Sequence, residues 1–219
     1  MIRPFADTTR RNIAGLCASF ARLPASTPVQ LTDPGLKRAA VAIVLVEAED
    51  VAKGTAKKGT ALVLTRRASG LRSHGGQWAL PGGRCDEGET PVAAALRELH
   101  EELGLELAPA HVLGLLDDYP TRSGYLITPV VVWSAKDAVI TPSPDEVASV
   151  HRIALEDIER ADAFDFTLIP ESTRRVIRFR CGGQLIHAPT AALIYQFREV
   201  LAGRDTRVAV LEQPVFAWR

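Results

Sequence analysis

The chain has 219 residues, of which 47% are hydrophobic and 24% are charged, so it is long enough and apolar enough to form a packed core. Its 26 basic and 26 acidic residues give a formal net charge of zero, which excludes a broad polyanion-binding surface but leaves room for a local basic patch. The longest apolar run, Ala39 to Val46, is too short to span a bilayer, and no apolar stretch follows the N-terminal arginines as in a secretory signal.

The three cysteines, Cys17, Cys85 and Cys181, are odd in number and far apart. No C-x-x-C pair is present, so the pattern predicts neither a disulfide framework nor a zinc site. We therefore expect a reducing, cytoplasmic environment, with no nucleic-acid partner and no membrane partner. The oligomeric state is open, with a homodimer as one option.

The predicted elements begin with an amphipathic helix within residues 1–24, followed by a linker rich in Pro, Thr and Ser up to residue 35. Asp7 or Thr8 can cap this helix, which is too small for a core of its own and should pack on the main domain. A central strand is expected over 37–48 and a second strand over 61–66, with a polar hairpin loop between them. A basic loop over 67–76 and a short extended segment over 77–80 follow.

Two further strands are predicted at 111–119 and 125–133, and Pro129 indicates an edge position or a bulge in the second of them. The remaining pattern predicts a strand, a short helix, a hairpin and a long helix, at 146–153, 155–161, 174–187 and 190–201. Strands on both sides of a central helix, with another helix near the end, indicate an α/β sandwich around a mixed sheet. We expect the main domain to span 36–205 and a tail to span 206–219.

The most informative stretch is Gly83 to Leu105, with the sequence GRCDEGETPVAAALRELHEELGL. Thr90 is a suitable N-cap for a helix, Pro91 suits the first helical position, and Gly104 suits a C-terminal stop. Apolar residues recur at three- and four-residue spacing along one face of this predicted helix. They are Val92, Ala95, Leu96, Leu99 and Leu103.

Three glutamates, Glu98, Glu101 and Glu102, lie together on the other side of the same helix. Like charges at this spacing cost an isolated helix about 0.2–0.5 kcal/mol per pair, and an ordinary exposed face would alternate Glu with Lys. Closely grouped carboxylates suit a hard divalent cation such as Mg2+, which keeps waters and substrate phosphates as its other ligands. On the helix alone, a solvated acidic face is the alternative.

The stretch resembles the Nudix box, in which a glycine and a glutamate precede the pattern Arg-Glu-apolar-x-Glu-Glu-x-Gly-apolar. Every specified position is filled, by Gly83, Glu89, Arg97, Glu98, Leu99, Glu101, Glu102, Gly104 and Leu105. The resemblance implies a Nudix α/β/α sandwich and a hydrolase, dependent on Mg2+ or Mn2+, that cleaves a diphosphate linked to another moiety. It also implies that Glu98, Glu101, Glu102 and a carbonyl near Gly82 hold the metal.

Other box residues take supporting roles under the same resemblance. Arg97 would orient the glutamates, and Glu89 would brace the turn or Arg97 itself. The general base is open among Glu98, Glu101 and Glu146, because water polarised by a metal does not need a strong base.

The segment before the box resembles the additional motif of coenzyme A diphosphatases. The matching positions are Thr65, Arg67, Ala68, Arg72, Gly76, Pro81, Gly82 and Gly83. Val63 and Leu80 depart conservatively from the Leu and Phe of the motif. The segments 124–131 and 142–147 are also similar to that subfamily, and 185–191 is similar more loosely, since the subfamily usually has Trp-Gly at His187 and Ala188.

This second resemblance implies hydrolysis of coenzyme A or its acyl esters to 3′,5′-ADP and (acyl-)4′-phosphopantetheine. Arg66, Arg67 and Arg72 are candidate substrate-binding residues, because guanidinium groups pair with phosphate oxygens in a bidentate manner. The departures at Leu80 and in 185–191 slightly favour the alternative of another nucleoside diphosphate derivative, such as ADP-ribose. A non-catalytic ligand sensor is the third option, but it would not require the complete glutamate set.

Overall fold

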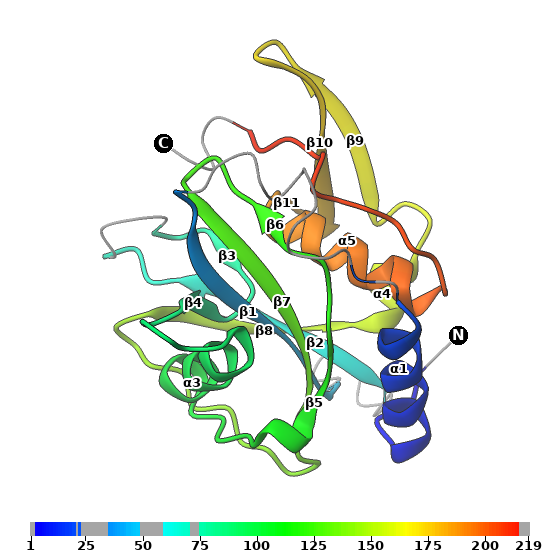
Figure 1. Ribbon diagram of the computed structural model, residues 1–219. Helices are drawn as coiled ribbons and strands as arrows, with labels where there is room; N and C mark the ends of the chain where they lie inside the picture. The colour runs from blue at the N-terminus through cyan, green and yellow to red at the C-terminus, as the bar shows by residue number, and fades with distance from the viewer. Residues whose placement is uncertain (1–2, 21, 23–34, 49–58, 71–74, 215–219) are drawn as a thin grey trace.

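The computed structural model describes residues 3–20, 22, 35–48, 59–70 and 75–214. In these ranges the chain forms four α-helices and eleven strands (Figure 1). The helices are α1 Asp7–Ser19, α3 Pro91–Leu103, α4 Leu155–Glu159 and α5 Thr190–Leu201, with a 3-10 turn at Pro109–His111. The strands are β1 Lys37–Glu47, β2 Thr60–Arg67, β3 Trp78–Ala79, β4 Gly82–Arg84, β5 Val112–Leu115, β6 Tyr119–Pro120, β7 Tyr125–Trp133, β8 Val147–Ala154, β9 Phe164–Ile169, β10 Ser172–Cys181 and β11 Gln184–His187.

Within the described residues, eight strands form a mixed sheet whose main path runs β3-β2-β1-β7-β5. The long central strands β1 and β7 are parallel, while β2 and β4 pair with β1 in the antiparallel sense. The short strand β6 pairs with β7, and β8 pairs with β2. The remaining strands, β9, β10 and β11, form a separate antiparallel sheet at the top of Figure 1.

The mixed sheet is buried on both faces, which explains the continuous apolar sequence of its central strand. Alternate residues of β1, such as Ala42 and Val44, pack with α3 on one face. Their neighbours Ile43 and Leu45 pack on the other face in the larger core that also contains residues of α1, α5 and the second sheet. This period-2 division of one strand between two cores produces the predicted sandwich.

The local signals around α3 act as the sequence predicts. Thr90 has an extended backbone, and its side-chain oxygen accepts a hydrogen bond from the Ala93 amide at 3.2 Å. Pro91 occupies the first turn, and Gly104 ends the helix with a left-handed φ of 66°. Both ends of the central helix are therefore fixed by residues next to it in the chain.

Three details differ from the sequence-based expectation. Helix α1 begins after Ala6 without a side-chain cap, so neither Asp7 nor Thr8 caps it. Pro129 lies in β7 between two paired neighbours and not at a sheet edge. Because Pro129 has no amide hydrogen to donate, the partner strand is interrupted opposite it, between the end of β5 and the start of β6. Strand β9 has no counterpart among the predicted elements.

This interruption in the partner strand contains two buried acids, Asp117 and Asp118. Asp118 accepts hydrogen bonds from Arg22 at 2.6 Å, from Arg38 at 3.1 Å and from a buried threonine on β7. Asp117 accepts a hydrogen bond from Arg207 at 2.7 Å. The two acids thus connect the main sheet to the segments that follow α1 and α5, while the limits of the domain, 36–205, stay a proposal.

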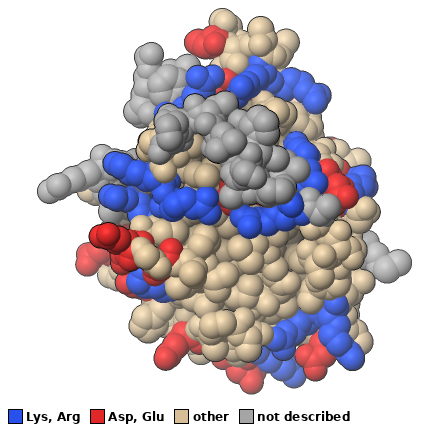
Figure 2. All heavy atoms as spheres, in the orientation of Figure 1, with Lys and Arg blue, Asp and Glu red and all other residues tan. Residues whose placement is uncertain are grey.

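Charge is distributed unevenly over the surface although it cancels in the sequence. Figure 2 shows a band of basic side chains across the middle of one face, with acidic side chains in smaller groups at its left, lower, right and upper edges. None of the described helices has the length and apolar character needed to cross a membrane.

Candidate active site

Two adjacent glycines of β4 bring this strand very close to both β1 and α3. A Cβ atom on Gly82, whose φ is 153°, would lie 2.3 Å from the Ala40 carbonyl oxygen. A Cβ atom on Gly83 would lie 2.2 Å from Oε1 of Glu98. Only glycine leaves the space that the Glu98 carboxylate occupies against the strand.

The carboxylates of Glu98 and Glu102 both lie against this glycine pair. Their side chains are one helical turn apart on α3 and are 13% and 4% exposed, respectively. The Gly82 amide donates a hydrogen bond to Oε2 of Glu102 at 3.3 Å. The structure therefore brings together two of the three glutamates that the sequence singles out.

The electrostatics of this pair are unusual for surface carboxylates. Burial raises the pKa of Glu102 to about 7, and the negative charge of Glu98 adds to the effect. Burial likewise raises the pKa of Glu98. Glu146, in the turn before β8, contributes to the increase in both pKa values, so this third predicted residue lies within electrostatic range.

Arg97 connects the box turn to the acidic face of α3. Its guanidinium donates to both carboxylate oxygens of Glu89, at 3.0 and 3.1 Å. The same group donates to Glu98 at 2.9 Å and to Glu101 at 2.8 Å. The hydrogen bond from Arg97 lowers the pKa of Glu89, whose other contact is the Asp86 amide. Arg97 thus fixes the positions of carboxylates on both sides of it.

Glu101 differs from its two neighbours, because its side chain is 48% exposed and lies next to Arg97. In the parts of the chain that the structure describes, no three Asp, Glu, His or Cys side chains are close enough together to hold a metal ion as they stand. The predicted ligand set is therefore present as an inner pair, Glu98 and Glu102, with Glu101 outside it.

The inner pair nevertheless fits a divalent cation by its chemistry. Glu102 is almost fully buried, and among the described residues its ion-pair partner is Arg67, whose Nη1 is 3.6 Å away. The negative charge of Glu102 is thus only partly balanced by nearby positive charge, which agrees with its raised pKa. Hard oxygen ligands in this condition suit Mg2+ or Mn2+.

The candidate substrate-binding arginines separate onto two faces of β2. Arg67 points to the α3 side, where it meets Glu102. Arg66 points to the opposite side, where its guanidinium lies 5.6 Å from the ring centroid of Trp78 and donates to the Gly76 carbonyl. Arg72 lies outside the described residues. Sequence reasoning missed Trp78, although strand alternation could have paired it with Arg66 across β2 and β3.

A family model described as the NUDIX domain matches residues 36–171, which is more than half of the chain. The protein belongs to the Nudix family. Proteins of this family typically depend on a divalent metal, and the mixed sheet with α3 on one face is the Nudix α/β fold. The sequence-based prediction of the family and of the fold is thus confirmed.

Curated relatives carry the same family name. The chain is 33% identical over 141 residues to the "Uncharacterized Nudix hydrolase NudL" of Photorhabdus laumondii, across 63% of this chain and 75% of the relative. It is 42% identical over 95 residues to the protein of the same name from Escherichia coli, across 43% of this chain and 50% of the relative. The chain thus spans about half the length of that second relative.

Solved structures include similar chains. One is a Nudix hydrolase from M. smegmatis, RenU, with a TM-score of 0.48 and 24% sequence identity, covering 77% of this chain and 87% of that one. Another is a MutT/nudix family protein from Enterococcus faecalis, with a TM-score of 0.48 and 15% identity, covering 90% of this chain and 73% of that one.

Proposed function

We propose that this Nudix protein uses Mg2+ or Mn2+ to hydrolyse the diphosphate of coenzyme A or acyl-coenzyme A. The products would be 3′,5′-ADP and 4′-phosphopantetheine or its acyl ester. The observation that carries the hydrolase proposal is the pair of buried carboxylates beside the Gly82–Gly83 turn, Glu98 and Glu102, of which Glu102 has its cation 3.6 Å away. The resemblance of 63–83 to the coenzyme A diphosphatase motif supports the choice of substrate.

The proposed ligands of the metal are Glu98, Glu101, Glu102 and the Gly82 carbonyl. A bound cation would neutralise charge on the diphosphate oxygens and make water a better nucleophile. Arg97 holds Glu98 and Glu101 by hydrogen bonds, and Glu101 would have to turn from this contact toward the inner pair to join the ligand set. The general base is taken from Glu98, Glu101 and Glu146, of which Glu98 has a pKa that burial raises.

Arg66 and Arg67 support a substrate that carries several phosphates, as coenzyme A does. Arg67 lies at the inner carboxylates, where it could pair with a diphosphate oxygen in place of Glu102 once a cation compensates that glutamate. Leu80, which departs from the motif, is 4% exposed and belongs to the core that contains α5. Its difference from Phe therefore changes core packing, so it gives little weight to the ADP-ribose alternative.

The proposal is tested by incubating the protein with Mg2+ and a panel of diphosphates. The panel contains coenzyme A, acetyl-coenzyme A, ADP-ribose, NADH, a dinucleoside polyphosphate and a nucleoside triphosphate, and products are separated by chromatography. We expect 3′,5′-ADP to form from the two coenzyme A compounds faster than any other substrate is cleaved. Faster cleavage of ADP-ribose would replace the proposal with its alternative, and no metal-stimulated cleavage at all would indicate a ligand sensor.

A further inference from the structure

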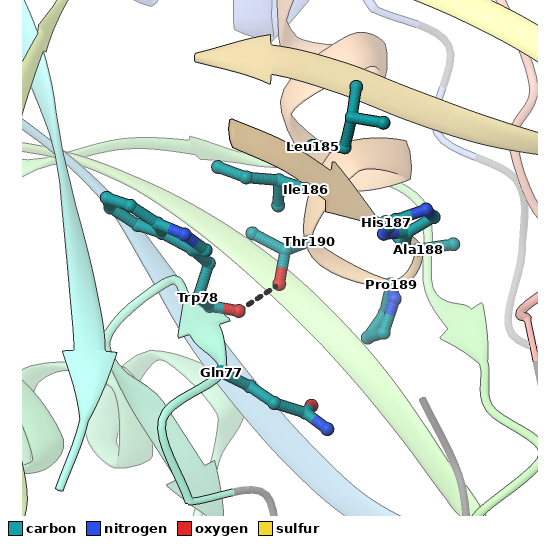
Figure 3. A pocket seen from close by; sticks show the side chains of 8 residues that line it. All are labelled: Gln77, Trp78, Leu185, Ile186, His187, Ala188, Pro189 and Thr190. Atoms are coloured by element: carbon teal, nitrogen blue, oxygen red, sulfur yellow. Dashed lines mark hydrogen bonds between the residues drawn. The ribbon is translucent and has the colours of Figure 1, made fainter. Parts of the chain in front are cut away.

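A small pocket lies on the opposite face of β2 from the carboxylates. It is formed by Gln77 and Trp78 on one side and by residues 185–190, at the end of β11 and the start of α5, on the other. Figure 3 shows Ile186 directed toward the indole of Trp78 and a hydrogen bond from the Thr190 hydroxyl to the Trp78 carbonyl oxygen. This 3.2 Å hydrogen bond ties the two walls together, and the pocket, which is open to solvent on one side, has a volume of about 120 Å³.

The pocket is connected to the carboxylates through two short pieces of chain. Trp78 precedes Gly82 by four residues, which span at most about 13 Å. On β2, the adjacent residues Arg66 and Arg67 contact Trp78 and Glu102, respectively. Arg66 and Arg67 point to opposite faces of the sheet, so a substituent of a diphosphate held near Glu102 would enter the pocket by passing the edge strand β3.

The lining of the pocket is uncharged and partly apolar. None of its described residues is Asp, Glu, Lys or Arg, and burial lowers the pKa of His187, so this ring is neutral at pH 7. Amide and hydroxyl groups come from Gln77 and Thr190. The buried indole N–H of Trp78 has no hydrogen-bond partner among the described residues, which is an uncommon state for such a donor.

We propose that this pocket binds the uncharged, amide-containing arm of the substrate, which in coenzyme A is the pantetheine arm. This assignment rests on the proposed function. A flexible chain with amide and apolar groups matches a lining of the same kind. A pocket of this size holds a group about as large as a single small ring, so it takes one amide-bearing segment of the arm and not the whole arm.

A nucleobase fits the same pocket less well. Bases bind proteins by stacking on an open aromatic face. The Trp78 ring is already contacted by His151, with ring centroids 4.5 Å apart, and by Arg66. A base would have to displace one of these neighbours, whereas an amide chain can bind at the edge of the indole.

The first test measures binding of pantetheine itself to the full-length protein, and so does not depend on catalysis. The indole N–H resonance of Trp78 is assigned with the variant Trp78→Phe and followed while pantetheine is added. We expect a saturable shift of this resonance in the wild type. The matched variants are Gln77→Tyr, which places a ring in the mouth of the pocket, and Gln184→Tyr, which makes the same change at an exposed position outside it. Absence of a shift in the wild type, or an equal shift in both variants, would overturn the assignment.

The second test separates the arm from the rest of the substrate. Kinetics are compared for coenzyme A and for the methyl ester of 3′-phospho-ADP, which has the same diphosphate and nucleoside but no arm. Gln77→Tyr should raise KM for coenzyme A by about tenfold and leave the methyl ester unaffected, since loss of a few buried contacts has an effect of this size. An equal rise for both substrates, or none, contradicts the pocket assignment while the proposed function stands. If the wild type cleaves neither compound, the proposed function fails and the pantetheine titration alone decides the pocket.

Discussion

Two buried carboxylates in this protein have the same exposure and opposite electrostatics. The side chains of Glu102, in the box helix, and Glu212, near the C-terminal end of the described chain, are each 4% exposed. The pKa of Glu102 is raised to about 7, whereas the pKa of Glu212 is lowered to about 2. Burial opposes ionisation at both residues. It is the largest influence on the pKa of Glu102, whereas at Glu212 the hydrogen bond from Arg122 outweighs it.

Glu212 has a complete set of donors. Arg122 donates to both of its oxygens, at 3.0 and 2.6 Å, and Ser172 and the Gln213 amide add further hydrogen bonds. Glu102 has one amide at 3.3 Å and the more distant Arg67. One carboxylate therefore stabilises the fold, while the other is kept in a state that a bound cation would relieve.

The largest expected effect is a loss of activity when the carboxylates of helix α3 are replaced. Replacing Glu98 or Glu102 with Gln should lower kcat/KM by about a thousandfold, because a group that acts on developing charge is removed. The exposed Glu87, in the same turn, provides the control Glu87→Gln, which should retain wild-type activity. Rates within about tenfold of wild type for Glu102→Gln would refute the metal assignment. Glu101→Gln belongs in the same series and should match the other two if Glu101 is also a ligand.

A smaller loss of activity is expected when the glutamates remain but the arginine that hydrogen-bonds them is replaced. The variant Arg97→Gln should lower kcat by about a hundredfold, because Glu98 and Glu101 would shift from the positions that Arg97 fixes. Arg160 forms an exposed ion pair with Asp162 and gives the control Arg160→Gln. Steady-state kinetics at saturating Mg2+ measure the effect, and an unchanged kcat would assign Arg97 a role in stability only.

At Glu212 the expected change is in stability. Glu212→Ala should lower the free energy of unfolding by about 2–3 kcal/mol, because Arg122, the Ser172 hydroxyl and the Gln213 amide all lose their acceptor. Because folding lowers this pKa, the contribution is complete above the unfolded value of about 4.3 and is lost as the pH falls toward 2. Urea unfolding at pH 7 and pH 3.5 measures both points. A variant as stable as the wild type at pH 7 would contradict the comparison.

The smallest expected effect is an increase in the stability of the metal-free protein when Glu102 is replaced. Because folding raises this pKa, ionisation makes the folded state less stable as the pH rises from about 4.3 through 7. Glu102→Gln should therefore increase stability at pH 8 by about 1–2 kcal/mol and have no effect at pH 4. Thermal unfolding in EDTA checks this, and added Mg2+ should stabilise only the wild type. A destabilised variant at pH 8 would show that Glu102 is fully compensated without metal.

Helix ends and turns that are set by residues next to them in the chain were predictable from the sequence. Thr90, Pro91 and Gly104 define the ends of α3, and Gly182 and Gly183 mark the turn between β10 and β11. Pro129 shows the limit of such signals. Its missing amide hydrogen was correctly expected to disturb a ladder, but the sequence cannot say whether the strand adapts by lying at an edge or its partner adapts by breaking off.

The candidate site also has some features that local sequence specifies and others that only the assembled fold creates. The identity and spacing of Glu98, Glu101 and Glu102 follow from the sequence. Their separation into an inner pair and an outer residue depends on β4, whose glycines lie against Glu98 and Glu102 but not Glu101. The contact of Arg67 with Glu102 and the pocket at Trp78 join residues that are far apart in the chain. No local pattern specifies contacts of this kind, because they arise only when β2, β3 and β11 are assembled.

The buried pair Asp117 and Asp118 limits how far the chain can be shortened without loss of stability. A fragment limited to the family-matched residues 36–171 would lack Arg22 and Arg207, and both acids would lose a cation that they contact at 2.6 and 2.7 Å. Losing a hydrogen bond between a charged donor and a buried carboxylate costs about 1.5–3 kcal/mol, which is a large share of the stability of a small domain. The shortest piece that folds by itself should therefore extend well beyond the recognisable family segment at both ends.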